Sequence, residues 1–441
     1  MKNFFKKIVV WILVTEARLV LRKYKPKIVA VTGSVGKTST KDAIYTILSS
    51  VTFVRKSEKS FNTEIGLPLT ILGCPNAWSN PFAWLGNFIE GMKLIVLPNH
   101  YPRTLILEVG ADRPGDIKNI VRWMKPDVAV ITKLSDVPVH VEFFASPEEV
   151  KKEKGFLASA VKSGGALILN ADDLDVVAFG QKTLMQNSPR TITYGYKNQA
   201  TLKASGYKII YKKRKGVSYP AGISYKINSG ETISVHGTIG MQNVYTTLAA
   251  LAVGFSEGLP IASMAETLEK HESPPGRMKI IEGINQSTII DDSYNSSPIA
   301  QKAALETLHD IKTNSGGTGG GKKIAILGDM LELGSFSVAE HKAVGEKVAE
   351  VCSMLITVGV RARVMREAAI AAGMSEGRTM SFEDSRAAGE YTKSIVAPGD
   401  VVLVKGSQGT LRMERAVEAI MAHPEDKKRL LVRQEEEWQK R

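Results

Sequence analysis

Near the start of the chain stands the stretch Ile28-Val29-Ala30-Val31-Thr32-Gly33-Ser34-Val35-Gly36-Lys37-Thr38-Ser39-Thr40. Its apolar, mostly β-branched beginning predicts a strand, and residues 41–48 have the pattern of a helix. A strand, a glycine-containing turn and a helix in this order form a loop whose backbone N–H groups face a phosphate. Lys37 would neutralise that phosphate, and the Thr38 hydroxyl would reach a bound Mg²⁺. The spacing G-x-x-G-K-T therefore predicts a short nucleotide-binding loop.

Apolar runs and helical stretches alternate along the chain after this loop. Strands are expected at 104–108, 127–132 and 166–170, and helices at 115–124 and 147–162. This alternation is typical of βαβ units in a mostly parallel sheet. Residues 191–237 have the pattern of short alternating strands, and an Ala- and Leu-rich helix is expected at 244–257.

The run Ser273-Pro274-Pro275-Gly276 is a strong helix and strand breaker, and α/β alternation resumes after it. Further strands are expected at 287–290, 323–327, 354–358 and 400–405, and the glycine-rich stretch 314–321 is interpreted as a flexible loop. We therefore expect an α/β protein with three parts. These are an N-terminal basic amphipathic helix (1–27), a central ATP-binding P-loop domain (28–274) and a C-terminal Rossmann-like α/β domain (275–441).

The composition is that of an ordinary folded protein. Of 441 residues, 43% are hydrophobic and 23% are charged, as in soluble globular chains. The two cysteines, Cys74 and Cys352, lie far apart in apolar surroundings, so we expect no disulfide, no zinc site and a cytoplasmic location. The net charge is +13, but no helix-turn-helix, zinc finger or aromatic-basic RNA motif accompanies it, so we expect no nucleic-acid partner.

Part of the positive charge lies in the first residues, on both sides of an apolar run at 8–14. This run is too short to span a bilayer, and Glu16 and Arg18 follow it closely. We interpret residues 4–24 as an amphipathic helix. Two placements stay open: the helix packs on the body of the protein, or it makes a peripheral contact with the anionic inner face of the membrane. We expect a monomer.

Polar residues of three kinds follow the predicted strands of the central part. Glu108 ends a strand that would lie near the phosphate loop, where a carboxylate can hold Mg²⁺. His140 follows the end of the next strand, and Lys154 lies on the helix after it. Each alone is more typical of a structural or solvent-exposed residue, and only their combination favours a site.

The combination resembles the Mur ligase family, the ATP-dependent amide-forming enzymes of peptidoglycan synthesis, from about residue 28 to the C-terminus. Thr32-Gly33-Ser34-Val35-Gly36-Lys37-Thr38-Ser39 is similar to its phosphate loop, and His140-Val141-Glu142-Phe143-Phe144-Ala145-Ser146 with Lys154 is similar to its second metal-binding block. Gly240-Met241-Gln242-Asn243 and Pro275-Gly276-Arg277-Met278 resemble the segments that contact the nucleotide.

Four further blocks are similar to the MurF type of this family, whose members add D-alanyl-D-alanine. The blocks are Asn62-Thr63-Glu64-Ile65-Gly66-Leu67-Pro68, Asp291-Asp292-Ser293-Tyr294-Asn295-Ser296-Ser297-Pro298, Leu327-Gly328-Asp329-Met330-Leu331-Glu332-Leu333-Gly334 and Val404-Lys405-Gly406-Ser407. The MurF type also has an N-terminal domain that binds a UDP-sugar nucleotide, whereas the basic helix stands before the phosphate loop in this sequence. Three alternatives stay open: the UDP end of the substrate is held differently, it is held by another chain, or the acceptor is not a UDP-sugar.

The resemblance implies a set of site residues. The catalytic residues would be Lys37, His140, Lys154 and Arg277. ATP would contact Gly33, Ser34, Val35, Gly36, Lys37, Thr38, Ser39, Asn243, Arg277, Asp292 and Asn295. Thr38 and Glu108 would hold one Mg²⁺, and Glu108, His140 and a carbamylated Lys154 would hold a second. The substrate-binding residues would be Asn62, Asp329, Lys405 and Ser407.

The reaction that the resemblance implies has two steps. ATP converts a carboxylate into an acyl phosphate, and an amine then attacks it in a site that excludes water. The leading interpretation is a ligase that adds D-alanyl-D-alanine to a muramoyl-tripeptide nucleotide. A second interpretation keeps the mechanism but changes the acceptor to another peptide, a polyglutamate or a lipid-linked precursor. A third is a nucleotide-binding scaffold without ligase activity.

Overall fold

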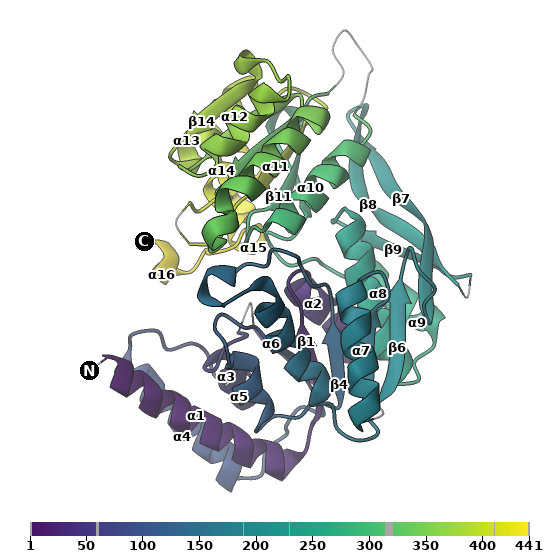
Figure 1. The fold of residues 1–441 in the computed structure, drawn as a ribbon, viewed down its shortest axis with the longest axis vertical. Helices are drawn as coiled ribbons and strands as arrows, with labels where there is room; N and C mark the ends of the chain where they lie inside the picture. Colours follow the sequence, from purple (N-terminus) through teal and green to yellow (C-terminus); the bar gives the residue numbers. More distant parts are fainter. Residues whose placement is uncertain are drawn as a thin grey trace.

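The computed structural model describes residues 2–58, 61–187, 189–228, 230–313, 321–409 and 411–439. Its strands form two sheets, which Figure 1 shows in separate parts of the molecule. The predicted α/β class with a mostly parallel central sheet is confirmed. The two free cysteines are both buried.

The first sheet has nine strands in the order β2-β3-β1-β4-β5-β6-β7-β8-β9. The strands are β1 (Lys27–Thr32), β2 (Val54–Lys56), β3 (Thr104–Glu108), β4 (Val128–Ile131), β5 (Ala166–Asn170), β6 (Arg190–Gly195), β7 (Leu202–Arg214), β8 (Val217–Ile227) and β9 (Thr232–His236). Pairing is parallel from β2 to β7 and antiparallel from β7 to β9. Because β1 pairs with β3 so that Val31 lies opposite Glu108, the phosphate loop and Glu108 leave the sheet at the same edge.

Helices cover both faces of this sheet, as the alternation of buried residues along β1 requires. Val29 and Val31 belong to one apolar core, and Ile28 and Ala30 to the other. The helices of this part are α2 (Lys37–Ser49), α3 (Gly66–Leu72), α4 (Pro81–Val96), α5 (Asp116–Val121), α6 (Pro147–Ser159), α7 (Leu174–Asn187), α8 (Met241–Ser256) and α9 (Ile261–Glu269). Helix α2 begins at Lys37 and not near residue 41, so the predicted start was wrong: the Lys-Thr pair already belongs to the first turn.

The second sheet has six strands in the order β10-β11-β15-β12-β13-β14 and is parallel except for β10. Its strands are β10 (Lys279–Glu282), β11 (Thr288–Asp292), β12 (Lys323–Gly328), β13 (Met354–Val358), β14 (Thr379–Phe382) and β15 (Val401–Lys405). Helices α10 (Pro298–Asp310), α11 (Ser337–Val351), α12 (Arg363–Ala371), α13 (Ser385–Ile395) and α14 (Glu414–Ile420) accompany it, followed by α15 (Lys427–Leu430) and α16 (Glu436–Gln439). The glycine-rich stretch interpreted as a flexible loop lies, at 314–320, outside the described residues.

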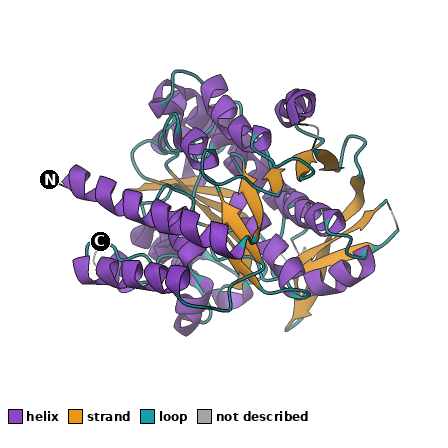
Figure 2. Cartoon of the chain, turned by 90° about the horizontal axis from the view of Figure 1, so that it is seen from below, coloured by secondary structure: helices purple, strands orange, loops and turns teal. Residues whose placement is uncertain are grey.

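The N-terminal segment is one helix, α1 (Lys2–Tyr24), and it packs on the body of the protein against α3 and α4. Its inner side carries the buried residues Val9, Leu13, Ala17 and Val20. Figure 2, seen from below, shows α1 running across this face of the molecule. In the part of the chain that the structure describes, no helix has the length and apolar character needed to cross a bilayer.

Candidate active site

The phosphate loop is held in place by the segment that follows β4. Thr132 Oγ1 donates to the Val35 carbonyl at 2.7 Å, and the Ser34 N–H donates to the Lys133 carbonyl at 2.6 Å. At Gly33 φ is +147°, and a Cβ there would lie 2.0 Å from Thr132 Oγ1, so only glycine fits this turn. Gly36 then caps the N-terminus of α2. The loop therefore has the preformed backbone that the sequence predicts.

A network of hydrogen bonds gathers four of the predicted site residues behind this loop. Thr38 Oγ1 donates to Glu108 Oε2 at 2.9 Å, and Asn62 Nδ2 donates to Glu108 Oε1 at 3.2 Å. Arg277 Nη2 donates to Thr38 Oγ1 at 3.3 Å. These residues come from α2, β3, the segment before α3 and the turn before β10. The structure thus brings together side chains that lie far apart in the sequence.

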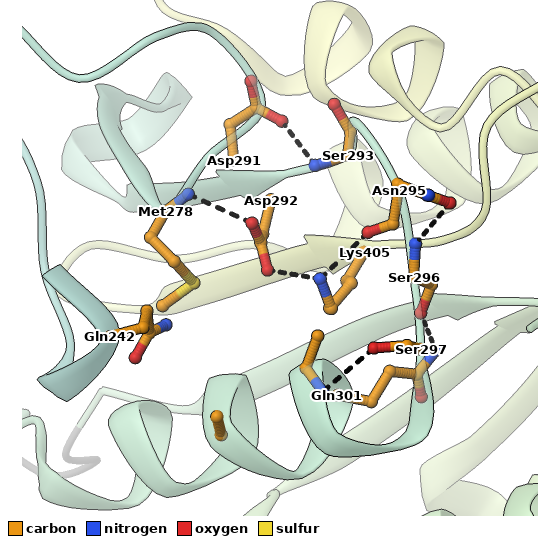
Figure 3. Close-up of polar contacts among 12 residues, drawn as sticks. Gln242, Met278, Asp291, Asp292, Ser293, Asn295, Ser296, Ser297, Gln301 and Lys405 are labelled. Carbon is orange, nitrogen blue, oxygen red and sulfur yellow. Dashed lines mark hydrogen bonds and ion pairs between the residues drawn. The ribbon is translucent and has the colours of Figure 1, made fainter. Parts of the chain in front are cut away.

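The turn before β10 fixes the direction of Arg277. The Gly276 N–H donates to Asp291 Oδ2 at 3.0 Å, and the Met278 N–H donates to Asp292 Oδ1 at 3.2 Å; Figure 3 shows the second bond. Gly276 has φ +67°, and a Cβ there would lie 2.9 Å from the backbone nitrogen of Tyr294. With both neighbours bound to carboxylates of β11, the Arg277 guanidinium lies 4.1 Å from the centre of the Tyr294 ring.

Two lysines of the predicted site lie close to one another, Lys37 half-buried and Lys154 buried. Lys37 Nζ donates to the Gly33 carbonyl at 3.0 Å, and burial lowers its pKa although Glu108 opposes this. Burial, together with the charge of Lys37, lowers the pKa of Lys154 to about 7. Near neutral pH a large fraction of Lys154 is therefore an uncharged amine, unlike an exposed lysine.

His140 lies where the two sheets meet and contacts a carboxylate from each part. Its Nδ1 lies 2.6 Å from Glu332 Oε2, and its Nε2 lies 3.4 Å from Asp112 Oδ1. The close contact with His140 lowers the pKa of Glu332. The backbone of His140 is left-handed, with φ +68°. No described contact joins His140 to Glu108 or Lys154, so their predicted metal cluster stays a prediction.

The predicted site residues of the six-stranded sheet contact mainly one another and nearby backbone (Figure 3). The Lys405 ammonium is buried, pairs with Asp292 and donates to the Asn295 carbonyl at 3.0 Å. Asn295 Oδ1 accepts from the N–H groups of Ser296 and Gln408, at 2.8 and 3.2 Å. Burial lowers the pKa of Lys405, whereas Asp292 opposes that shift.

Asp329 and Ser407 form a second cluster at the ends of β12 and β15. The Ser407 N–H donates to the Asp329 carbonyl at 3.1 Å, and the Asp329 carboxylate accepts from the Ala362 N–H at 2.7 Å. Ser407 Oγ accepts from the Leu331 N–H at 3.0 Å, just before Glu332. In the other part, Asn243 is buried at the start of α8 and donates to the Ile239 carbonyl at 2.8 Å.

A cavity of 1590 Å³ opens between the two sheets beside the phosphate loop. Thr38 and Arg277 line it from the predicted site, and Tyr294 lines it from the second part. The C-terminal segment closes one side, where the Trp438 ring stands edge-on to Trp78 with 6.4 Å between centroids. The cavity is large enough for a nucleotide together with a second substrate.

Sequence reasoning missed several residues of this site. Glu332 and Tyr294 lie in blocks that were recognised, but nothing local indicated that they face His140 and Arg277. Asp112 lies shortly after Glu108, and its place past a strand end was the one available signal. Among the described residues, no group of three or more His, Cys, Asp and Glu side chains is arranged to hold a metal ion; the predicted ligand sets instead include the Thr38 hydroxyl and Lys154.

The sequence of this chain matches two domains of a known family. The Mur ligase middle domain matches residues 31–83 and 89–254, and the Mur ligase glutamate ligase domain matches residues 276–408. The chain belongs to the Mur ligase family. Both matched Mur ligase domains contribute to the network around Thr38, since Glu108 lies in the first and Arg277 in the second.

Individual Mur ligases resemble the chain over most of its length. The UDP-N-acetylmuramoyl-tripeptide–D-alanyl-D-alanine ligase of Bacillus subtilis is 29% identical over 419 residues, which are 92% of this chain and 79% of the relative. The ligase of the same name from Escherichia coli is 26% identical over 411 residues, with the same shares. The crystal structure of MurF ligase from Thermotoga maritima in complex with ADP has a TM-score of 0.74 and 25% identity, and covers 95% of this chain and 84% of that one.

Proposed function

We propose that this protein is an ATP-dependent ligase that joins D-alanyl-D-alanine to a muramoyl-tripeptide nucleotide. The substrates are those in the names of the relatives from Bacillus subtilis and Escherichia coli. The observation that carries the proposal is the hydrogen bond from Arg277 to Thr38, because it joins the second part of the chain to the phosphate loop across the cavity. The family matches end at residue 254 and resume at 276, which supports a division into domains near residue 274.

Two chemical steps account for the product. A carboxylate oxygen of the acceptor attacks the γ-phosphorus of ATP, and ADP leaves with the electrons of the broken P–O bond. The neutral amine of the dipeptide then attacks the acyl carbon, phosphate leaves, and the amine proton passes to water. Lys37 and Arg277 carry positive charge to the transferring phosphoryl group. The acyl phosphate has to be kept from water until the amine attacks, because hydrolysis would destroy it.

The residues near Thr38 fit a bound Mg²⁺. Thr38 Oγ1 and Glu108 Oε2 are 2.9 Å apart and are both oxygen donors, the ligands that Mg²⁺ prefers. When bound, Mg²⁺ would neutralise charge on the phosphates. We infer that Thr38 and Glu108 hold one ion, and that Glu108, His140 and Lys154 serve a second.

Lys154 would act as a ligand only as a carbamate. Its buried place beside Lys37 favours the uncharged amine, which is the form that adds to CO₂ and releases one proton. The carbamate supplies an anionic oxygen where the ammonium would repel a cation. We infer that ATP contacts Asn243, Asp292 and Asn295, that Asn62, Asp329, Lys405 and Ser407 shape the substrate end, and that the protein works as a monomer.

The test measures ligated product and released phosphate together. The full chain is mixed with ATP, Mg²⁺, UDP-muramoyl-tripeptide and D-alanyl-D-alanine, and with each substrate omitted in turn. We expect the ligated product, by mass spectrometry, only in the complete mixture. Lys37→Met should remove it, and Lys342→Met, an exposed lysine on α11, should not.

Two results would contradict parts of the proposal. Phosphate could be released with another acceptor, such as a folate or a lipid-linked precursor, and not with the muramoyl nucleotide. That result would show that the proposed acceptor is wrong and the ligase mechanism right. Tight ATP binding without phosphate release for any acceptor would show that the protein is a nucleotide-binding scaffold without ligase activity.

A further inference from the structure

Helices α1 and α4 lie side by side at the lower edge of the molecule (Figure 1). Near the end of α1, Lys23 Nζ donates to the carbonyls of Leu94 and Leu97 at the end of α4, at 2.9 and 2.6 Å. Farther back, a Cβ at Gly91 would lie 2.3 Å from Glu16 Oε2, so the helices touch there as well. The two helices therefore run in the same direction, and each has a side turned away from the protein.

The outer side of α4 carries an apolar stripe along its whole length. Phe82, Leu85, Ile89, Met92 and Val96 recur at intervals of three and four and form one exposed stripe. Phe82 is 83% exposed and Val96 is 67% exposed. The helix carries two charged residues, Glu90 and Lys93, which pair with each other at 2.7 Å. A surface helix normally turns a polar side to water, so this stripe indicates a partner.

The exposed side of α1 has both apolar and basic residues. Phe5, Ile8 and Trp11 are exposed, and Trp11 is exposed by 70%. Arg18 and Arg22 follow Trp11 at helical spacing and lie on its side of the helix. An apolar band bordered by basic residues is typical of helices that lie in the surface of a bilayer.

A basic cavity of 690 Å³ continues this border beyond the end of α1. Seven cationic side chains and one carboxylate line it: Arg18, Arg22, Lys25, Lys27, Arg122, Lys125, Lys162 and Asp127. Asp127 already pairs with Lys162 at 2.9 Å. Within the described ranges, Arg18, Arg22 and Lys25 have no ion-pair partner. The cavity therefore has a large excess of positive charge, which an anionic headgroup would balance.

Helix α1 lies before the part of the chain that matches the Mur ligase middle domain, and the match has a gap within α4. The middle-domain match begins at residue 31, after α1, and leaves residues 84–88 unmatched in α4. Part of this surface, α1 and Leu85 of the stripe, therefore lies outside the residues that match the Mur ligase middle domain.

We propose that α1, α4 and the basic cavity form a docking face for the surface of an anionic lipid bilayer. The apolar stripe enters the region between headgroups and acyl chains, and Arg18, Arg22 and Lys25 contact the anionic headgroups. Lipid fits better than a second copy of the chain, because a symmetric dimer on this face would bring two basic borders together. The proposal is independent of the acceptor assigned above.

The test is sedimentation of the full chain with vesicles of phosphatidylcholine, with and without phosphatidylglycerol, at low and high salt. We expect strong binding to vesicles with phosphatidylglycerol at low salt, weakened by salt, and little binding to neutral vesicles. Arg18→Glu/Arg22→Glu should weaken binding at least about tenfold. Leu85→Ser/Ile89→Ser should weaken it by about tenfold or more.

Matched controls lie on other faces of the molecule. Leu174→Ser changes an exposed leucine on α7, and Lys342→Glu reverses an exposed lysine on α11. Neither should change vesicle binding, and all four variants should keep the melting curve of the parent chain because the changed side chains are exposed.

Three outcomes would overturn the proposal. The first is a parent chain that ignores phosphatidylglycerol vesicles at low salt. The second is binding that neither double variant weakens relative to the controls. The third is a lipid-free dimer that Leu85→Ser/Ile89→Ser dissociates, because the face would then belong to a second copy.

Discussion

The polar residues at the carboxyl ends of the two sheets make different kinds of contact. At the nine-stranded sheet, Thr38, Glu108 and Asn62 come from separate segments and bond to one another beside the cavity. At the six-stranded sheet, Asp292 and Lys405 form a buried pair that is tied to backbone groups of the adjoining loops. Similar motif residues thus form an open hydrogen-bonded network beside the cavity at one sheet, and at the other a buried ion pair that also holds the adjoining loops. The comparison predicts losses of turnover for the first group and losses of stability for the second.

The largest effect is expected at Lys154. Lys154→Ala should lower kcat by about 10³-fold or more, because it removes the anionic ligand that the carbamate supplies. Since the pKa of Lys154 is about 7 and carbamate formation needs the neutral amine, activity of the parent enzyme should fall as the pH drops through about 7. Initial rates from pH 6 to 8 check this, with added bicarbonate raising the acidic limb. Full activity in Lys154→Ala would remove the carbamate from the mechanism.

Arg277→Ala should lower kcat by about 10²-fold, since the guanidinium no longer reaches the phosphate loop. The Gly276 and Met278 backbone bonds to β11 do not depend on the Arg277 side chain, so the melting temperature should change little. Steady-state kinetics beside thermal unfolding checks both, with Arg363→Ala on α12 as the control. A large loss of stability with kcat unchanged in the folded fraction would place Arg277 with the second group.

Lys405→Met should lower the free energy of unfolding by about 3 kcal/mol, because it leaves the buried Asp292 carboxylate without its cation. The double variant Asp292→Asn/Lys405→Met should recover part of this loss, since no charge is then left unpaired. Denaturant unfolding of Lys405→Met, Asp292→Asn and the double variant gives the coupling free energy between the two side chains. Unchanged stability together with lost substrate affinity would show that the pair acts on the substrate alone, and would remove the contrast between the sheets.

A smaller effect is expected for Glu332→Gln, which removes the charge that contacts His140 from the second part of the chain. We expect a loss of about tenfold in kcat/KM for ATP at limiting Mg²⁺, partly recovered at high Mg²⁺. Glu346→Gln, an exposed change on α11, is the control. A loss that Mg²⁺ does not relieve would indicate that Glu332 acts through domain contact alone.

The features that could be predicted from the sequence are those that the spacing of residues determines by itself. Gly33, Lys37 and Thr38 stand in a local motif, and the apolar runs around them set the order of strands and helices. Contacts across the cavity were not predictable, because His140 meets Glu332 only after both parts have folded and packed. Helix α4 was not predicted, for a different reason. Apolar residues lie on both its buried and its exposed side, so its sequence lacks the alternation of apolar and polar residues that indicates an amphipathic helix. The same feature makes its exposed stripe unusual.

The most consequential proposal is that the residues around Thr38 convert the acceptor carboxylate into an acyl phosphate. It is tested most directly with acceptor labelled with ¹⁸O in its reacting carboxylate, in the presence of ATP and D-alanyl-D-alanine. If an acyl phosphate forms, one carboxylate oxygen appears in inorganic phosphate for each amide bond formed, as mass spectrometry of the phosphate would show. Unlabelled phosphate during productive ligation would contradict it.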